Sequence, residues 1–144
     1  MYLAFSSWLV AFLAISTLSI VTGVEFSDTA ADAYSIPYHT KLTGSLPSGD
    51  LDFFVITMFV GRYNRVYLET TGTTTSKHIY IYDSNLNEVT KGTGTHGFLD
   101  LTPTQTQNFY IKIWAATYGE YESYNVAVID YNTLDCLRFS RIMF

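Results

Sequence analysis

The chain has 144 residues, a length that suits one domain with its own hydrophobic core and is short for two. Aromatic residues make up 17% of it and charged residues 15%, below the roughly 25% of an ordinary globular protein, and this composition favours β-structure. The net charge of −5, with only 8 Lys and Arg and no basic cluster, argues against nucleic-acid binding, which depends on neutralising phosphates.

The N-terminal segment contains no charged side chain before Glu25. The run WLVAFLAI at residues 8–15 has the length of a signal-peptide centre, and VTG at residues 21–23 offers small residues for cleavage, although no Lys or Arg precedes the run. A retained membrane anchor is the alternative, because residues 2–23 are just long enough to span a bilayer. A buried core helix is a third interpretation, but the segment has no polar face. We expect residues 1–23 to be a helical signal peptide or membrane anchor.

From residue 38 onward, short β-favouring runs alternate with turn residues, and no segment shows helical periodicity over three turns. This spacing is typical of a sandwich or barrel. We expect an all-β fold: an antiparallel β-sandwich, jelly-roll-like, of about eight strands. The domain is expected at residues 24–130, followed by a tail at 131–144. The predicted strands are 38–43, 53–59, 64–69, 78–83, 87–90, 98–101, 108–114 and 124–130.

The segment GTGTHG at residues 92–97 matches G-x-G-x-x-G, the pattern of a dinucleotide-binding loop. Such a loop must be followed by a helix, whose N-terminus holds the pyrophosphate. Here FLDLTPTQTQ follows, which is strand-like and soon reaches Pro103. We therefore interpret the segment as a hairpin loop between two strands.

Two predicted strands alternate between aliphatic and aromatic residues. In NFYIKIW (108–114), Phe and Ile share one face, and Tyr, Lys and Trp share the other; HIYIYD (78–83) likewise separates Ile from Tyr. The second face is either the rim of the core or a partly exposed aromatic patch. We expect Tyr80 and Tyr110 to complete the core. The candidate ligand-binding residues are Trp114, Tyr118 and Tyr121.

Several separated segments share their order and residue pattern with a known family. They are VEFSDTAADA (24–33), LTGSLPSGDLDFFVI (42–56), HIYIYDSNLNEV (78–89) and FYIKIWAATYGEYESYNVAV (109–128). Together they resemble the bacterial pre-peptidase C-terminal domain family, which is a β-sandwich module. The resemblance implies a domain that accompanies exported peptidases and other exported enzymes, with relatives that bind collagen with calcium.

The resemblance also implies a calcium site, because the calcium-binding relatives take ligands from the acidic opening segment and from the D-x-D before the first long strand. The matching positions here are Glu25, Asp28, Asp50 and Asp52. Ser27 stands where the family often has Asn, so the amide carbonyl oxygen of that Asn is lost from the set of possible ligands. The alternative is that Asp50 and Asp52 only form the turn in PSGDLDFF by bonding nearby backbone amides.

No pattern in the sequence predicts catalysis, and we expect no catalytic residues and no cofactor apart from calcium. His39, His78 and His96 accompany no G-x-S-x-G or H-E-x-x-H motif, and Cys136 is a single cysteine in the tail without a partner motif. We expect an exported, non-enzymatic binding or accessory module, secreted or at the cell surface, that recognises an extracellular protein or polysaccharide. The alternatives are a structural subunit held in the membrane by residues 1–23 and a small secreted hydrolase. The oligomeric state stays open.

Overall fold

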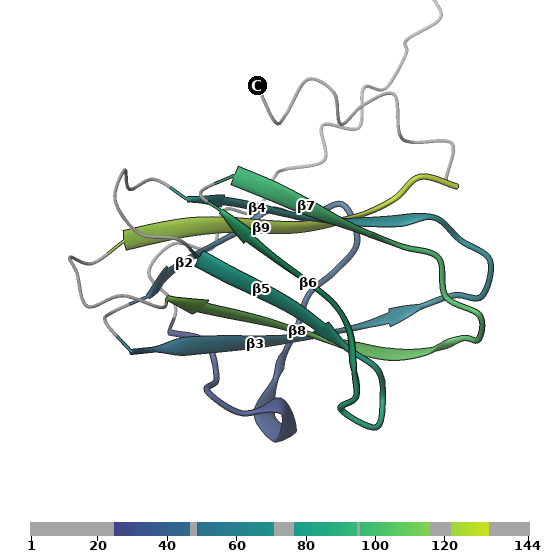
Figure 1. Ribbon diagram of the computed structural model, residues 1–144, viewed down its shortest axis with the longest axis horizontal. Coiled ribbons are helices and arrows are strands. Elements are labelled where there is room, and N and C mark those ends of the chain that lie inside the picture. Colours follow the sequence, from purple (N-terminus) through teal and green to yellow (C-terminus); the bar gives the residue numbers. More distant parts are fainter. Residues whose placement is uncertain (1–24, 47–48, 71–76, 95, 116–121, 133–144) are drawn as a thin grey trace, which may run out of the picture.

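The structure, a computed structural model, describes residues 25–46, 49–70, 77–94, 96–115 and 122–132. Two β-sheets pack face to face with the hydrophobic core between them (Figure 1). The expected signal or anchor segment and the tail beyond residue 132 lie outside the described residues. Within the described ranges, no helix is both long and apolar enough to cross a membrane.

In the ranges given above, the two sheets contain nine strands, and a short 3-10 helix, η1 (Ala30–Asp32), precedes them. One sheet has the order β1-β3-β8-β5-β6 and the other the order β2-β9-β4-β7. All the strand pairs are antiparallel except β1 with β3. The order of β2 to β9 is that of a jelly roll. The strands are β1 (Tyr34–Ser35), β2 (Leu42–Leu46), β3 (Leu51–Met58), β4 (Asn64–Thr70), β5 (Lys77–Tyr82), β6 (Glu88–Gly94), β7 (His96–Leu101), β8 (Gln107–Ala115) and β9 (Glu122–Asp130).

Each of the eight predicted strands corresponds to one of β2 to β9, so the all-β prediction is confirmed. The additional strand β1 has only two residues, too few for a sequence pattern. Strand β2 begins four residues later than predicted, at Leu42 rather than residue 38, because the chain first turns at His39, which has a φ of 60°.

The prediction that residues 92–97 form a hairpin loop between two strands is wrong. Strand β6 extends to Gly94 at the edge of one sheet, and β7 begins at His96 at the edge of the other. The chain therefore crosses between the sheets here. The rejection of a dinucleotide-binding loop stands, because a strand and not a helix follows the glycines.

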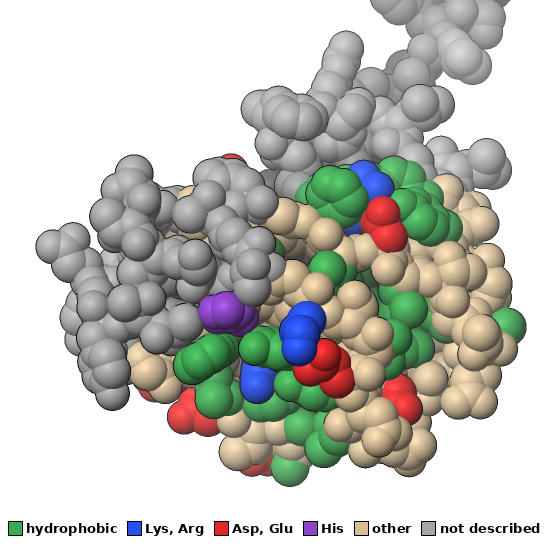
Figure 2. All heavy atoms as spheres, in the orientation of Figure 1, with side chains coloured by type: hydrophobic (Ala, Val, Ile, Leu, Met, Phe, Trp, Pro, Cys, Tyr) green, Lys and Arg blue, Asp and Glu red, His purple; other side chains and the backbone are tan. Residues whose placement is uncertain are grey.

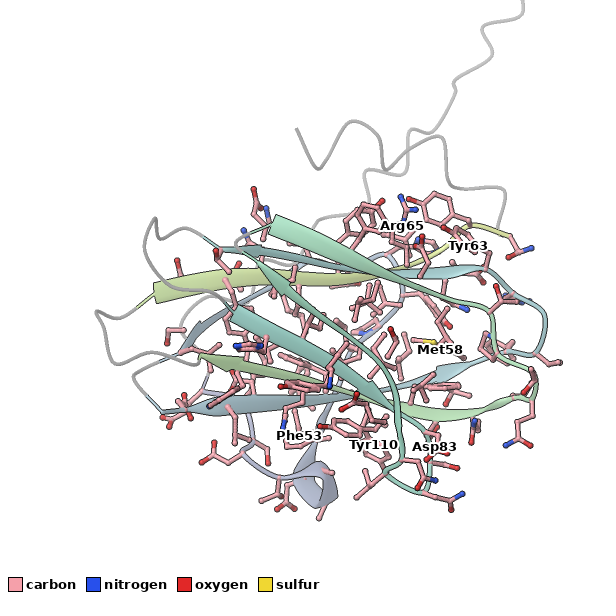
Figure 3. All side chains as sticks on the ribbon, viewed as in Figure 1. Phe53, Met58, Tyr63, Arg65, Asp83 and Tyr110 are labelled. Carbon is pink, nitrogen blue, oxygen red and sulfur yellow. The ribbon has the colours of Figure 1, made fainter. Side chains whose placement is uncertain are left out.

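The alternation of side chains along the central strands forms the core. In β8, Phe109, Ile111 and Ile113 are buried between the sheets, and in β5 Ile79 and Ile81 are buried with them. The intervening residues lie on the outer face of the five-stranded sheet. Figure 3 shows this division at other positions: Met58 lies between the sheets, whereas Phe53 lies outside them.

The expectation that Tyr80 and Tyr110 complete the core is wrong. Both side chains are half-buried on the outer face of the five-stranded sheet, opposite the buried isoleucines of the same strands. The aliphatic residues and phenylalanines on the inner face already fill the space between the sheets. The aromatic residues of the second face therefore form a partly exposed patch.

Candidate functional site

Two groups of side chains have the chemistry of a binding site. The first is the acidic cluster, made of Glu25, Asp28, Asp50 and Asp52. The second is the aromatic face, made of the side chains on the outer side of β5 and β8: His78, Tyr80, Tyr82, Tyr110, Lys112 and Trp114.

The acidic cluster forms where the segment before η1 meets the start of β3. The backbone N–H of Phe53 donates to the carbonyl of Ser27 at 2.8 Å, which ties the two segments together. Burial is the largest cause that raises the pKa of Asp50 and of Asp52, and the negative charges of Asp28 and Glu25 raise both further. The four carboxylates that the resemblance to the family picks out therefore lie close enough for their charges to affect one another.

Asp52 is the most deeply buried member of the cluster, with 1% of its surface exposed. Its Oδ2 accepts a hydrogen bond from the hydroxyl of Tyr124 at 2.5 Å, while its Oδ1 accepts none from the described residues. Burial raises the pKa of Asp52 to about 6, although the bond from Tyr124 opposes this. Burial raises the pKa of Tyr124 as well, so the phenol keeps its proton and acts as the donor.

Gly44 makes room for this bond. It lies opposite Tyr124 in the pairing of β2 with β9, and a Cβ atom at residue 44 would be 2.4 Å from the Cζ and Oη atoms of that ring. A side chain cannot be accommodated at this distance. The glycine therefore lets the ring cross the backbone of β2 and reach Asp52.

Asp50 differs from Asp52 in that one of its oxygens has a role in the turn. Its Oδ1 accepts the backbone N–H of Leu51 at 2.9 Å, as the turn interpretation predicts, whereas its Oδ2 is buried and accepts no hydrogen bond from the described residues. Burial is the main cause that raises the pKa of Asp50. Turn formation thus explains one carboxylate oxygen of Asp50 and neither oxygen of Asp52.

The donor atoms of the cluster suit a hard cation, because calcium takes carboxylate and carbonyl oxygens. Asp50 and Asp52 each contribute a buried oxygen without a hydrogen-bond donor, and these are the atoms that a cation would satisfy. However, within the part of the chain that the structure describes, no three His, Cys, Asp or Glu side chains converge as metal ligands do. The cluster thus has suitable atoms without an assembled coordination shell.

The aromatic face carries rings in register on neighbouring strands. Along β5, the rings of His78 and Tyr80 are 6.3 Å apart and those of Tyr80 and Tyr82 are 6.1 Å apart, with interplanar angles of 27° and 16°. Trp114 of β8 pairs with His78, and their ring centroids are 5.2 Å apart. Tyr110 pairs in the same way with Tyr82. Figure 2 shows a histidine with hydrophobic and basic side chains near it on the side of the molecule that faces the viewer.

Trp114, a candidate ligand-binding residue, is half-buried within this face. The other two candidates, Tyr118 and Tyr121, lie outside the described residues. Sequence reasoning did not name His78 or Lys112 as candidates, although it placed Lys112 on the second face and the same alternation along residues 78–83 puts His78 there as well. The Nζ atom of Lys112 is 4.5 Å from the ring centroid of Tyr80, the distance of a cation–π contact.

The outer side of the four-stranded sheet carries another aromatic group, centred on Arg65 (Figure 3). The Cζ atom of Arg65 is 3.8 Å from the ring centroid of Phe98, and two guanidinium nitrogens donate to the Asp100 carboxylate at 2.6 and 2.8 Å. These bonds lower the pKa of Asp100. The group also includes Tyr63, Tyr67 and Tyr131. Because Arg65, the cation of this group, is paired with Asp100, the group has no net charge.

The histidines named as candidates come from different parts of the fold. The backbone of His39 donates to the carbonyl of Val128 in the four-stranded sheet, whereas His78 lies on the outer side of the five-stranded sheet. His96 begins β7.

The chain was compared with protein families, curated proteins and solved structures. No family model and no curated protein matches the sequence. Among solved structures, the pre-peptidase C-terminal domain of collagenase from Bacillus anthracis is similar, with a TM-score of 0.58 at 16% identity over 67% of this chain and 93% of that one. A mitogen from Yersinia pseudotuberculosis matches with a TM-score of 0.53 at 12% identity, over 65% and 86%. The structural resemblance to a pre-peptidase C-terminal domain is thus confirmed as a likeness of β-sandwich fold.

Proposed function

We propose that this chain is an exported, non-enzymatic binding module that recognises an extracellular protein or polysaccharide through the aromatic face. The observation that carries the proposal is the ordered array of rings around Lys112 on the outer side of β5 and β8. Aromatic side chains offer a large contact area at a low entropic cost, which suits recognition of a ligand. The likeness to a domain of a collagenase supports an accessory role.

Co-sedimentation of the full chain with insoluble collagen, chitin, cellulose and peptidoglycan tests the proposal. We expect one of these polymers to retain the chain and Trp114→Ala to abolish retention. Phe98→Ala is the matched control, because Phe98 is an exposed aromatic residue on the opposite sheet. Retention that Trp114→Ala leaves intact but Phe98→Ala abolishes would contradict the proposal.

We further propose that the acidic cluster binds calcium. The supporting observation is that two buried carboxylate oxygens, one each of Asp50 and Asp52, accept no hydrogen bond from the described residues, beside Glu25 and Asp28. Bound calcium would neutralise carboxylates whose mutual repulsion opposes folding, and these four residues would hold it. The site would stabilise the junction between the segment before η1 and β3.

Thermal unfolding tests this second proposal. A ligand that binds only the folded state adds about 2.7 kcal/mol at a concentration 100 times its Kd, so calcium should raise the Tm and a chelator should reverse the effect. Asp52→Asn should reduce the response, whereas Glu88→Gln, an exposed carboxylate on β6, should keep it. An equal Tm with calcium and with chelator at neutral pH would contradict the proposal.

Export forms part of the proposed function and is supported by the uncharged, apolar start of the sequence. Mass spectrometry of the chain recovered from its host separates the alternatives. A mature chain that begins near residue 24, outside the cytoplasm, supports a cleaved signal peptide. An intact chain in the membrane fraction supports the anchored subunit instead.

A further inference from the structure

Among the Lys and Arg side chains that the structure describes, all but one form an ion pair. Five Lys and Arg side chains are described, and four of them form ion pairs: Lys41 with Glu69, Arg62 with Asp130, Arg65 with Asp100 and Lys91 with Glu88. The fifth, Lys112, forms no ion pair with a described carboxylate. Its cation instead lies over the rings of Tyr80 and Tyr82, at 4.5 and 5.7 Å from their centroids.

The aromatic face therefore differs in charge from the chain as a whole, whose net charge is −5. Next to Lys112 and Tyr80, strand β6 contributes Lys91, which is neutralised by Glu88 at 3.2 Å. Among the side chains described on this face, the charge left without an opposite partner is the positive charge of Lys112. A half-buried cation that lies over aromatic rings can pair with an anionic group of a ligand.

The surroundings of Lys112 are amphipathic rather than hydrophobic. None of the six residues of the aromatic face is among the large hydrophobic residues with more than a third of their surface exposed. Those residues include Phe98 and Tyr131 on the other sheet, where a protein or membrane contact would find more apolar area. Half-buried rings with polar hydroxyl edges suit ligands that have both C–H faces and hydroxyl groups, as sugars do.

The arrangement of the rings also suits an elongated ligand. His78, Tyr80 and Tyr82 follow one another along a single strand, and Trp114 extends the array onto the adjacent strand beside His78. Several rings in a row can contact successive units of a polymer, whereas a small molecule would need a concave pocket.

From these observations we infer that the aromatic face binds anionic polysaccharides, whose sugar rings carry carboxylate or sulfate groups, and that Lys112 pairs with the acidic group. This inference rests on the proposed function and specifies its ligand. The rings supply contact with the sugars, and the lysine selects the charged chains over the neutral ones.

Fluorescence of Trp114 tests the inference in the full chain. Trp8→Phe leaves Trp114 as the only tryptophan, so its emission reports on the aromatic face. The probes are polygalacturonate and heparin as acidic polymers, and dextran and hydroxyethylcellulose as neutral ones. We expect at least one acidic polymer to change the emission, no response to the neutral polymers, and weaker binding at high salt because screening shortens the reach of the charges.

Variants on the same background assign the effect to Lys112. Lys112→Gln keeps most of the side chain and should weaken binding roughly tenfold, as expected for the loss of one charge-assisted hydrogen bond. Lys41→Gln is the matched control, because Lys41 precedes β2 of the other sheet, and it should bind as the parent chain does. Circular dichroism and the Tm verify that both variants fold.

The outcomes separate this inference from the proposed function. Equal binding of neutral and acidic polymers, or an unchanged affinity in Lys112→Gln, would overturn the anionic selectivity and leave the aromatic face as a binding site. If collagen alone retained the chain, and Trp114→Ala abolished that retention, the aromatic face would remain a binding site but its selectivity for anionic polysaccharides would be overturned. A lack of response to all these probes, together with no Trp114-dependent co-sedimentation, would overturn both.

Discussion

Asp52→Asn should stabilise the folded chain at neutral pH. Asp52 is almost completely buried, and burial raises its pKa from 3.8 to about 6. A carboxyl whose pKa is raised by folding favours the folded state most when it is protonated, below about pH 4. That contribution is lost as the pH rises through 6. A rise of about two units in the pKa of Asp52 corresponds to about 3 kcal/mol. The ionised carboxylate therefore lowers the free energy of unfolding by about this amount at pH 7 to 8, relative to the protonated form.

Asparagine removes this cost and keeps the main contact. Its amide oxygen can accept the hydrogen bond that the hydroxyl of Tyr124 now donates to Asp52. Its NH₂ group takes the place of the Oδ1 atom, which accepts no hydrogen bond from the described residues. The substitution also removes a negative charge that the carboxylates of Asp50 and Asp28 repel. The polar contacts of residue 52 should therefore improve on substitution.

Urea unfolding of the parent chain and of Asp52→Asn, with chelator between pH 4 and pH 8, measures the effect. The difference in unfolding free energy should be small at pH 4 and should grow to about 3 kcal/mol in favour of the variant by pH 8. Glu88→Gln should show no comparable growth, because Glu88 is exposed. A variant that is less stable than the parent at pH 8, or a difference that does not vary with pH, would refute the reasoning.

Two further substitutions test other parts of the same account. Gly44→Ala should destabilise the chain by about 1 to 3 kcal/mol in urea unfolding, because its Cβ would meet the Tyr124 ring; an unchanged midpoint would show that the ring yields at no cost. Asp100→Asn should have the opposite pH dependence to Asp52→Asn. The bonds from Arg65 lower the pKa of Asp100, so its stabilising effect is present at neutral pH and disappears in acid. Thermal melts should show a larger loss of Tm for Asp100→Asn at pH 7 than at pH 3.

The strands could be predicted because their signals are local. The alternation in residues 108–114 and 78–83 fixed the inner face of β8 and β5, and the turn residues between the runs separated the strands. The same alternation placed Tyr80 and Tyr110 on the second face. Their assignment to the core failed because a sandwich buries only one face of each sheet, and the inner residues already fill it.

The contacts that build the acidic cluster could not be predicted, because they join distant parts of the chain. Asp52 accepts its hydrogen bond from Tyr124 in β9, and that contact depends on Gly44 in β2. The relation between these three residues exists only once the jelly roll pairs β2 with β9. The sequence placed Asp52 in a candidate site through its resemblance to a family, without indicating what holds its carboxylate.

The most direct test of the central claim is NMR mapping of the aromatic side chains of the full chain, in the presence of soluble fragments of the polymer that retains it. The account predicts shifts concentrated on Tyr80, Tyr82 and Trp114, with Phe98 and Tyr131 on the opposite sheet unchanged. Shifts at Phe98 and Tyr131 that spare Trp114 would contradict it and would place recognition on the four-stranded sheet.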